Sequence, residues 1–337
     1  MLRIPYQELF DTLLRVLLKL GLKPERAELC ARLFAETTRD GVYSHGVNRF
    51  PRFVLQIRNG TIDIHGSPQL VAATGALERW DGKLGPGPWN AYQSMARAIA
   101  LCRQHGIGCV GLANTTHWLR GGSYGWQAAE AGVIGICWTN TMPNLPPWGA
   151  SDARVGNNPL IIAVPRPNGH VVLDMAMSQF SYGALASYRS RGELLPVEGG
   201  FDSEGRLTRD AAAIEASHRP LPIGYWKGSG LALLLDLMAA LVAGGRGTHQ
   251  IAPDSDRENH LSQVFVALDP SSLRTIGDSP DGPGNVADEI IASVQMPKQP
   301  GGARVRYPGE QVLKIRSENM ANGIPVEPSI WNQIKAM

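Results

Sequence analysis

The sequence is poor in cysteine, with four in 337 residues. A disulfide framework is typical of small secreted domains, and so few cysteines in a chain of this length exclude one. Three of the four, Cys30, Cys102 and Cys137, have apolar neighbours. We therefore expect buried free thiols and a reducing, cytoplasmic location.

The sequence also lacks an excess of charge of one sign and any long hydrophobic run. Lys and Arg number 32 against 30 Asp and Glu, which gives no electrostatic reason to expect a nucleic-acid or anionic-membrane partner. The longest apolar run, residues 231–243, contains Asp236 and is too short to span a bilayer. Charges at helical spacing interrupt the first 20 residues, which excludes a signal peptide there. We expect a soluble protein with neither a membrane nor a nucleic-acid partner.

Metal-binding and nucleotide-binding motifs are missing or misplaced. There is no H-E-x-x-H, C-x-x-C or Walker A sequence, so we predict no metal site. Residues 106–111 match the fingerprint G-x-G-x-x-G, but a predicted helix precedes them and a strand follows, the reverse of the Rossmann order. Residues 121–125 match the nucleophile elbow G-x-S-x-G after a poor strand. A hydrolase using Ser123 is therefore the alternative from a different class.

Glycine and proline are abundant, with 38 and 24 residues, which predicts many turns and argues against a helix bundle alone. The first 60 residues have helical periodicity, with one helix ending at Gly21 and another opening at Pro24. The Gly/Pro-rich residues 81–88 mark the strongest boundary. Beyond it we expect helices at 89–105, 126–131, 230–243 and 287–294, and strands at 109–112, 132–138, 160–164, 170–174 and 264–268. This order predicts an α+β fold.

The strongest candidate for chemistry is the segment Ser-His-Gly-Val-Asn-Arg at residues 44–49. On a helix, His45 and Arg49 would share a face. Histidine is the side chain best suited to deliver a proton near neutral pH, and arginine binds a carboxylate through two parallel hydrogen bonds. One face with both groups suits the reduction of a 2-oxo acid. The spacing alone also fits a capping Ser44 and a surface Arg49, so both interpretations stay open.

Three further segments can line a site. The glycines around Lys227 open an apolar helix, where a phosphate can bind, although a flexible loop with an exposed lysine also fits. Asp174 ends a predicted strand and can accept hydrogen bonds from ribose hydroxyls. His117 lies beside tryptophan and polar residues that can line a pocket, but it can also be a buried core histidine.

Taken together, these segments resemble one family. The motifs occur in this order: residues 44–49 (Ser-His-Gly-Val-Asn-Arg), 116–118 (Thr-His-Trp), 156–159 (Gly-Asn-Asn-Pro), 173–178 (Leu-Asp-Met-Ala-Met-Ser), 226–228 (Trp-Lys-Gly) and 307–310 (Tyr-Pro-Gly-Glu). In these motifs the chain is similar to the type-2 malate/L-lactate dehydrogenase family, over nearly its whole length except residues 270–305. The resemblance implies a non-Rossmann, NADH-binding α+β domain at 76–306 with a mixed, largely antiparallel sheet. It also implies a helical domain at 1–75, joined by the C-terminal segment 307–337.

The resemblance also implies a cofactor, a partner and site residues. His45 is implied as the proton donor, and from the chemistry we assign substrate binding to Arg49, which would hold the C1 carboxylate, and to Ser44 and His117. The family forms homodimers whose active-site cleft can include the neighbouring subunit. NADH, with NADPH as the alternative, is expected at these residues: His170, Val171, Val172, Leu173, Asp174, Met175, Ala176, Trp226, Lys227, Gly309, Glu310 and Gln311.

Longer strings narrow the expected substrate. Residues 41–53, 120–130 and 224–230 are most similar to family members that reduce 2,3-diketo-L-gulonate to 3-keto-L-gulonate. Family members share their chemistry and differ in pocket residues, which spacing does not rank. Other 2-oxo acids, namely malate, lactate, ureidoglycolate or a cyclic imino acid, therefore stay open as substrates.

Overall fold

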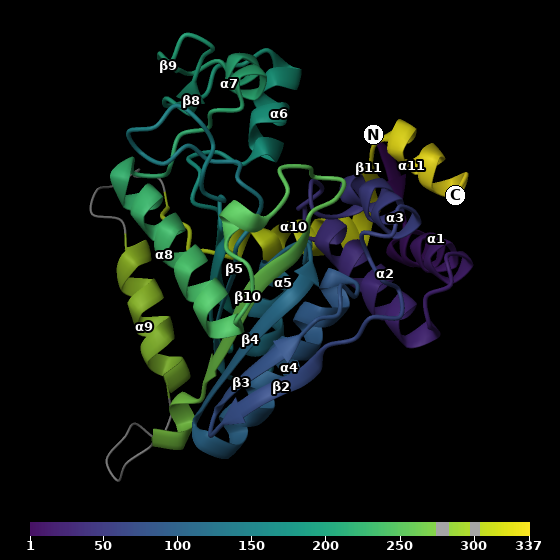
Figure 1. Cartoon of the computed structure of the whole chain (residues 1–337), viewed down its shortest axis with the longest axis vertical. Helices are drawn as coiled ribbons and strands as arrows, with labels where there is room; N and C mark the ends of the chain where they lie inside the picture. Colours follow the sequence, from purple (N-terminus) through teal and green to yellow (C-terminus); the bar gives the residue numbers. More distant parts are fainter. Residues whose placement is uncertain (274–282, 297–303) are drawn as a thin grey trace.

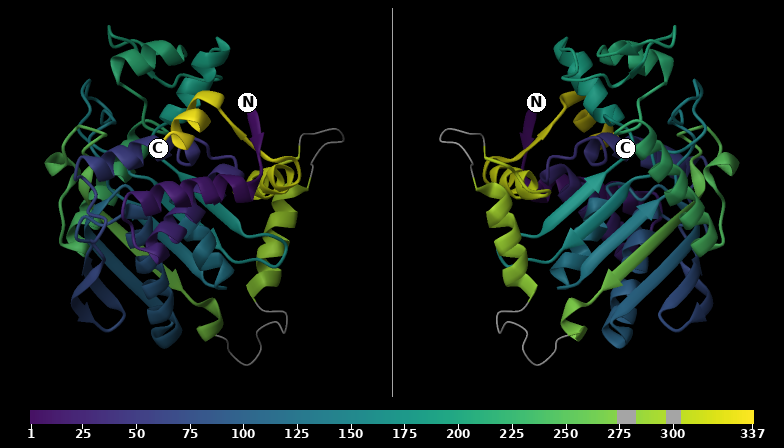
Figure 2. Two further views of the ribbon diagram at one scale, coloured as in Figure 1. Left: turned by 90° about the vertical axis from the view of Figure 1, so that its right-hand side faces the viewer. Right: turned by 90° about the vertical axis from the view of Figure 1, so that its left-hand side faces the viewer.

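The computed structural model describes residues 1–273, 283–296 and 304–337. The N-terminal segment forms four helices: α1 (Tyr6–Lys19), α2 (Pro24–Arg39), η1 (Val47–Arg49) and α3 (Phe50–Arg58). The C-terminal segment adds two: α10 (Glu310–Asn322) and α11 (Pro328–Lys335). Strand β1 (Leu2–Ile4) pairs antiparallel with β11 (Ile324–Val326), so segments from the two ends of the chain lie side by side (Figure 2).

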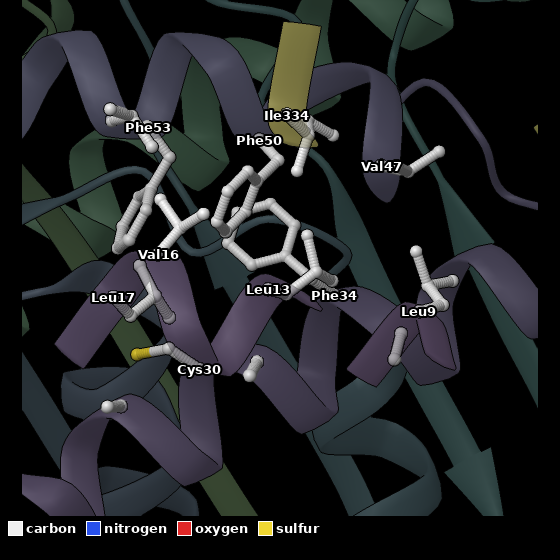
Figure 3. Packing of buried hydrophobic residues seen from close by; sticks show 14 of the residues in the cluster. Leu9, Leu13, Val16, Leu17, Cys30, Phe34, Val47, Phe50, Phe53 and Ile334 are labelled. Carbon is white, nitrogen blue, oxygen red and sulfur yellow. The ribbon is translucent and has the colours of Figure 1, made fainter. Parts of the chain in front are cut away.

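One hydrophobic core joins these terminal helices. The buried face of α1 repeats at three- and four-residue spacing: Leu9, Leu13, Val16 and Leu17. Phe34 of α2 packs edge-on against Phe50 and Phe53 of α3, with ring centroids 5.1 and 5.3 Å apart (Figure 3). Ile334 of α11 and Val47 of η1 belong to the same core. The core therefore fixes the segment between α2 and α3, which carries the predicted proton donor.

The middle of the chain forms a seven-stranded sheet in the order β2-β3-β4-β10-β5-β6-β7. The strands are β2 (Gln69–Thr74), β3 (Leu77–Asp81), β4 (Ile107–Thr116), β5 (Ile134–Thr139), β6 (Leu160–Val164), β7 (Val171–Met175) and β10 (Asn259–Leu268). Strands β3 and β4 pair in parallel, and the other neighbours pair antiparallel. This confirms the predicted α+β class with a mixed, largely antiparallel sheet. The glycine-rich residues 106–111 lead into β4 and not into a helix, as the sequence indicates.

Helices cover both faces of the sheet because successive side chains of a strand point to opposite sides. On β10, Phe265 and Ala267 belong to one hydrophobic cluster, and Val264 and Val266 pack in another. The first cluster contains residues of α4 (Gly87–His105) and α5 (Gly122–Glu130). The second contains residues of α8 (Trp226–Ala243) (Figure 1). The sheet is thus the middle layer of three.

A small subdomain stands apart from these layers, at the top of Figure 1. It contains α6 (Tyr182–Arg191), β8 (Gly200–Phe201), β9 (Leu207–Thr208) and α7 (Ala211–Ser217), and we call it the α6–α7 subdomain. It has a small core of its own: Leu185, Leu195, Ala211 and Ile214. The remaining elements are η2 (Thr248–Gln250), η3 (Pro270–Leu273) and α9 (Pro283–Gln295).

Helix α8 is longer than the helix that the sequence predicts at residues 230–243. It begins at Trp226, has 18 residues, and is by length and composition long and apolar enough to cross a membrane. The prediction that this apolar segment is too short to span a bilayer is therefore wrong, because the helix starts before the apolar run. Asp236, midway along it, accepts hydrogen bonds from Asn140 Nδ2 and from the N–H of Thr248, each at 2.9 Å. These bonds tie α8 to the end of β5 and to the loop that follows α8.

Candidate functional site

A cavity of about 1040 Å³ lies where the terminal helices, the sheet and the α6–α7 subdomain meet. Segments far apart in sequence line it, including residues from 42–52, 117–121, 139–144, 157–159, 172–176, 181–183 and 306–312. Many of the predicted site residues are among them: Ser44, His45, Arg49, His117, Val172, Leu173, Asp174, Ala176 and Gly309. The structure therefore brings the predicted substrate residues and part of the predicted cofactor residues into one space.

The turn after α2 carries the predicted proton donor. Thr38 Oγ1, near the end of α2, accepts the N–H of Val47 at 2.9 Å. Gly46 fits against this bond because a Cβ there would lie 2.4 Å from Thr38 Oγ1. Residues 43–46 form turns before η1, so the two candidate side chains do not share one α-helix as the spacing suggested. They nevertheless line the same cavity.

His45 is half-buried in the cavity wall and neutral at pH 7. Burial, followed by the positive charges of Arg49 and Arg120, lowers the pKa of His45 from 6.5 to about 4. Its Nδ1 lies 3.0 Å from the Oγ of Ser44, and its ring stacks on that of His117 with centroids 5.9 Å apart. A bound anion would favour the imidazolium form, so this site can gain a proton together with an anionic ligand.

His117 has a defined tautomer. Its Nδ1 accepts the N–H of Leu119 at 3.0 Å, so the neutral ring carries its proton on Nε2. Burial, followed by the charges of Arg49 and His45, lowers the pKa of His117 well below 6.5. A neutral ring with an Nε2–H donates a hydrogen bond, and this residue lines the cavity. It can therefore bind a carbonyl oxygen there.

Arg49 faces a carboxylate that the sequence analysis did not single out. Its Nη2 lies 3.4 Å from Oε2 of Glu258, in the loop before β10, and both residues line the cavity. They are 209 positions apart, and Glu258 belongs to none of the motifs, so no local pattern identifies it. In the described parts of the chain, Nε and Nη1 of Arg49 donate no hydrogen bond. A bound carboxylate can pair with either of them together with the second N–H of Nη2.

Asp174 lies at the end of β7 and faces the start of α5. Its Oδ2 accepts the N–H of Gly122 at 2.8 Å and lies 3.9 Å from Nε of Arg120. Burial raises the pKa of Asp174, and the charge of Arg120 and the Gly122 bond oppose this. Arg120 is also paired with the buried Asp40 at 2.8 Å. Arg120, which lines the cavity, is thus anchored to the end of α2.

The predicted cofactor segment lies partly in the cavity. Gly309 has a φ of 95°, and a Cβ there would lie 3.1 Å from the nitrogen of Val172, so only glycine allows this approach to β7. Glu310 follows, and its Oε2 is buried without a hydrogen-bond partner among the described residues. The absence of a side chain at Gly309, which lines the cavity, fits the close approach of a dinucleotide to this wall. Seven of the predicted cofactor residues do not line the cavity: His170, Val171, Met175, Trp226, Lys227, Glu310 and Gln311.

Two predicted cofactor residues and the alternative nucleophile lie elsewhere. Trp226 and Lys227 begin α8 outside the cavity lining, and Trp226 is 66% exposed. Ser123 lies in α5, also outside the lining, and no hydrogen bond joins its hydroxyl to a histidine in the part of the chain that the structure describes. Nor do the described residues contain a group of three or more His, Cys, Asp or Glu side chains that could hold a metal ion. The geometry gives the hydrolase alternative no support.

Comparison with known proteins identifies the family. The family model described as malate/L-lactate dehydrogenase matches residues 4–335. The chain therefore belongs to the malate/L-lactate dehydrogenase family, and it is an oxidoreductase.

Individual relatives and solved structures agree with this. The chain is 44% identical to the 2,3-diketo-L-gulonate reductases of Citrobacter koseri and Escherichia coli K12, over 100% of each protein. Sulfolactate dehydrogenase from Methanocaldococcus jannaschii has a TM-score of 0.91 at 25% identity and covers 99% of this chain and 96% of its own. Δ1-Piperideine-2-carboxylate reductase from Pseudomonas syringae has a TM-score of 0.88 at 25% identity and covers 100% and 99%. These likenesses extend over the whole length of the chain.

Proposed function

We propose that the protein reduces 2,3-diketo-L-gulonate to 3-keto-L-gulonate with NADH. The observation that carries the proposal is the cavity, which gathers His45, Arg49 and His117 beside the β7 and Gly309 walls. A 2-oxo acid needs a cation for its carboxylate and a proton for its ketone oxygen, and these side chains supply both. The choice of this 2-oxo acid is supported by the full-length relatives at 44% identity.

The chain's own residues have separate tasks in this reaction. Arg49 binds the C1 carboxylate through the free N–H of Nη2 and one neighbouring N–H, and His117 donates its Nε2–H to the C2 carbonyl oxygen. Bound NADH supplies the hydride that C2 receives. His45 gives its Nε2 proton to the oxygen as the C–O double bond becomes a single bond, while its Nδ1–H donates to the Ser44 hydroxyl, 3.0 Å away. The product is the 2-hydroxy acid.

The cofactor assignment rests on the walls of the cavity. A dinucleotide would lie along Val172–Ala176 and Gly309, which line the cavity. Arg306 also lines the cavity, and a guanidinium can bind the 2′-phosphate that distinguishes NADPH. We therefore propose NADH and keep NADPH as the alternative.

The test is a panel of 2-oxo acids with each nicotinamide cofactor. We expect loss of NADH absorbance with 2,3-diketo-L-gulonate, at a higher kcat/KM than with pyruvate, oxaloacetate, a cyclic imino acid or the oxidised form of ureidoglycolate. A higher kcat/KM for another compound would move the substrate within the family. Release of product without any cofactor would overturn the oxidoreductase assignment for this cavity.

We further propose that α8 pairs with a second copy of the chain in a homodimer. One stripe of α8 is apolar yet 42–70% exposed: Leu234, Leu237, Met238 and Leu241. A contiguous exposed apolar stripe favours burial in an interface. The exposed Trp226 and Lys227 begin this helix, outside their own cavity, so in a dimer they can reach the partner's cofactor. The resemblance to a dimeric family supports the same partner.

The domain boundary and the cellular location are also proposals. We propose a domain boundary before Gln69, because β2 pairs within the large sheet although the sequence suggests a helical domain over 1–75. The terminal domain would then be 1–68 with 307–337, supported by the hydrophobic core that both ends share. We propose a cytoplasmic location because Cys30, Cys102, Cys109 and Cys137 are all free.

A further inference from the structure

We propose that Glu258 is a positioning residue that holds the guanidinium of Arg49 in the orientation that binds the substrate carboxylate. The inference rests on the proposed function and deepens it. Glu258 does not touch the reacting atoms in this proposal. It acts through Arg49, and it does so across two parts of the fold, from the loop before β10 to the segment between α2 and α3.

The ion pair is buried and held at both ends. Glu258 is 4% exposed, its Oε2 lies 3.4 Å from Nη2 of Arg49, and its Oε1 lies 3.4 Å from the N–H of Met142. The carboxylate therefore lies between a main-chain donor in the loop after β5 and the guanidinium. Glu258 contacts only one N–H of Nη2, so the other N–H of Nη2 and one neighbouring N–H, on Nη1 or Nε, form an edge of the guanidinium that can face a ligand. A carboxylate on another side of a guanidinium is a standard way to fix a bidentate clamp.

The loop that carries Glu258 is itself fastened to α3 and the turn after it. Gln56 Nε2 donates to the carbonyl of Ser255 at 3.0 Å, and Asn59 Nδ2 and Thr61 Oγ1 donate to that of Asp256 at 3.0 and 3.3 Å. We call residues 255–258 the strap. Since α3 follows η1 directly, the strap ties Glu258 to the same backbone that carries Arg49. The distance between the two charged groups is thus set by the fold and not by a flexible loop.

If the carboxylate of Glu258 is removed, its charge and its positioning of Arg49 predict opposite changes in substrate binding. An ionised Glu258 repels an anionic substrate, so if its charge were its main effect, the variant Glu258→Gln would bind the substrate more tightly. If Glu258 positions Arg49, the same variant weakens the bond that orients the guanidinium, and the substrate binds less well. Glutamine keeps the shape and an acceptor oxygen, so the two effects are separated from loss of packing.

The experiment measures steady-state kinetics of the full-length protein with 2,3-diketo-L-gulonate and NADH. We expect Glu258→Gln to raise KM for the 2-oxo acid by about tenfold, the loss typical of weakening a charge-assisted hydrogen bond, with KM for NADH unchanged. Asp254→Asn is the matched control, because Asp254 lies in the same loop, is exposed and does not line the cavity. The control should leave both KM values within about twofold. An unchanged or lower KM for the 2-oxo acid in Glu258→Gln would overturn the proposal.

A double-mutant cycle tests whether Glu258 acts through Arg49. In the Arg49→Lys background the fork is gone, so adding Glu258→Gln should change KM by less than about twofold. Additive effects would mean that Glu258 acts independently, and would overturn the proposal. Glu258→Asp keeps the charge but shortens its reach, and we expect a KM between those of the wild type and Glu258→Gln. If the wild type reduced no 2-oxo acid, the proposed function would fail instead, so the two failures are distinct.

Discussion

At the scale of single residues, the site depends on a histidine that lacks its proton before the substrate arrives. Burial, followed by Arg49 and Arg120, lowers the pKa of His45 to about 4, so the free protein carries a neutral imidazole at pH 7. A carboxylate bound at Arg49 offsets that positive charge and favours the imidazolium. Proton uptake is thereby linked to binding of the anionic substrate and not to the cofactor alone.

The low pKa of His45 predicts an unusual pH profile. The kcat/KM of reduction reports the protonation of the free enzyme, which is complete below the pKa and falls by about tenfold per pH unit above it. Reduction should therefore become steadily less efficient from about pH 5 to pH 8, whereas an ordinary histidine would give a plateau below its pKa near 6.5. Stopped-flow or steady-state rates at constant ionic strength would check this. A midpoint near pH 6.5 would contradict the lowered pKa.

Removal of the imidazole should have a large effect on turnover. The variant His45→Ala should lower kcat for reduction by about 10²–10⁴, the range for a missing general acid, with KM for NADH nearly unchanged. Ser44→Ala removes only the partner of Nδ1, 3.0 Å away, and should lower kcat by a smaller factor. Turnover of His45→Ala close to that of the wild type would reject His45 as the proton donor.

The sequence could predict the residues that recur in local motifs, and not their distant partners. The segment 44–49 indicates both His45 and Arg49 because the roles of the two side chains can be inferred from a few neighbouring positions. In the structure they lie on turns and η1 rather than on one helix. Glu258 lies 209 positions from Arg49, and a solvated loop carboxylate has the same local sequence. Its role is set by the strap, which is a contact between distant segments.

At the scale of elements, α6 touches the loop that holds the proton donor. Gly183, in the first turn of α6, would place a Cβ 3.0 Å from Cβ and 3.1 Å from Oγ of Ser44. Contacts this short require the neighbour to move, and Ser44 is the hydrogen-bond partner of His45. The start of α6 therefore leaves no room for a side chain beside Ser44, the hydrogen-bond partner of the imidazole.

Adding one methyl group at Gly183 tests the effect of α6 on Ser44. Gly183→Ala should lower kcat several-fold because Ser44 is displaced, while thermal stability stays equal or rises, since alanine favours a helix by about 1 kcal/mol over glycine. Ser187→Ala, at an exposed position of the same helix, is the control and should keep kcat. Equal kcat in both variants, measured beside their melting temperatures, would show that α6 does not act on Ser44.

The strands show where periodicity succeeds as a signal. β5, β6, β7 and β10 were predictable because both faces of the sheet are covered and each strand contains a short apolar run. β2 is exposed along all six residues, so its sequence has no apolar repeat that distinguishes it from the helical domain predicted for residues 1–75. β1 and β11 have three residues each and form only because the two ends of the chain meet.

At the scale of the whole molecule, one buried carboxylate links three parts of the fold. Asp40, at the end of α2, pairs with Arg120 from the loop before α5 and with Arg316 of α10, at 2.8 Å in each case. Burial alone would raise the pKa of Asp40, but the Arg316 bond and the arginine charges lower it overall. The C-terminal helix and the cavity wall are thus held to the same point.

The last prediction concerns the assembly. If α8 forms the dimer interface, a charge in its exposed apolar stripe must be buried without a partner on association, which is costly. Leu234→Glu should therefore give a monomer by sedimentation equilibrium, and, if Lys227 reaches the partner's cofactor, a raised KM for NADH. Leu18→Glu, at a 43% exposed position of α1, should remain dimeric. A wild-type protein that sediments as a fully active monomer would exclude α8 as an interface between copies, and its leucines would then require another partner.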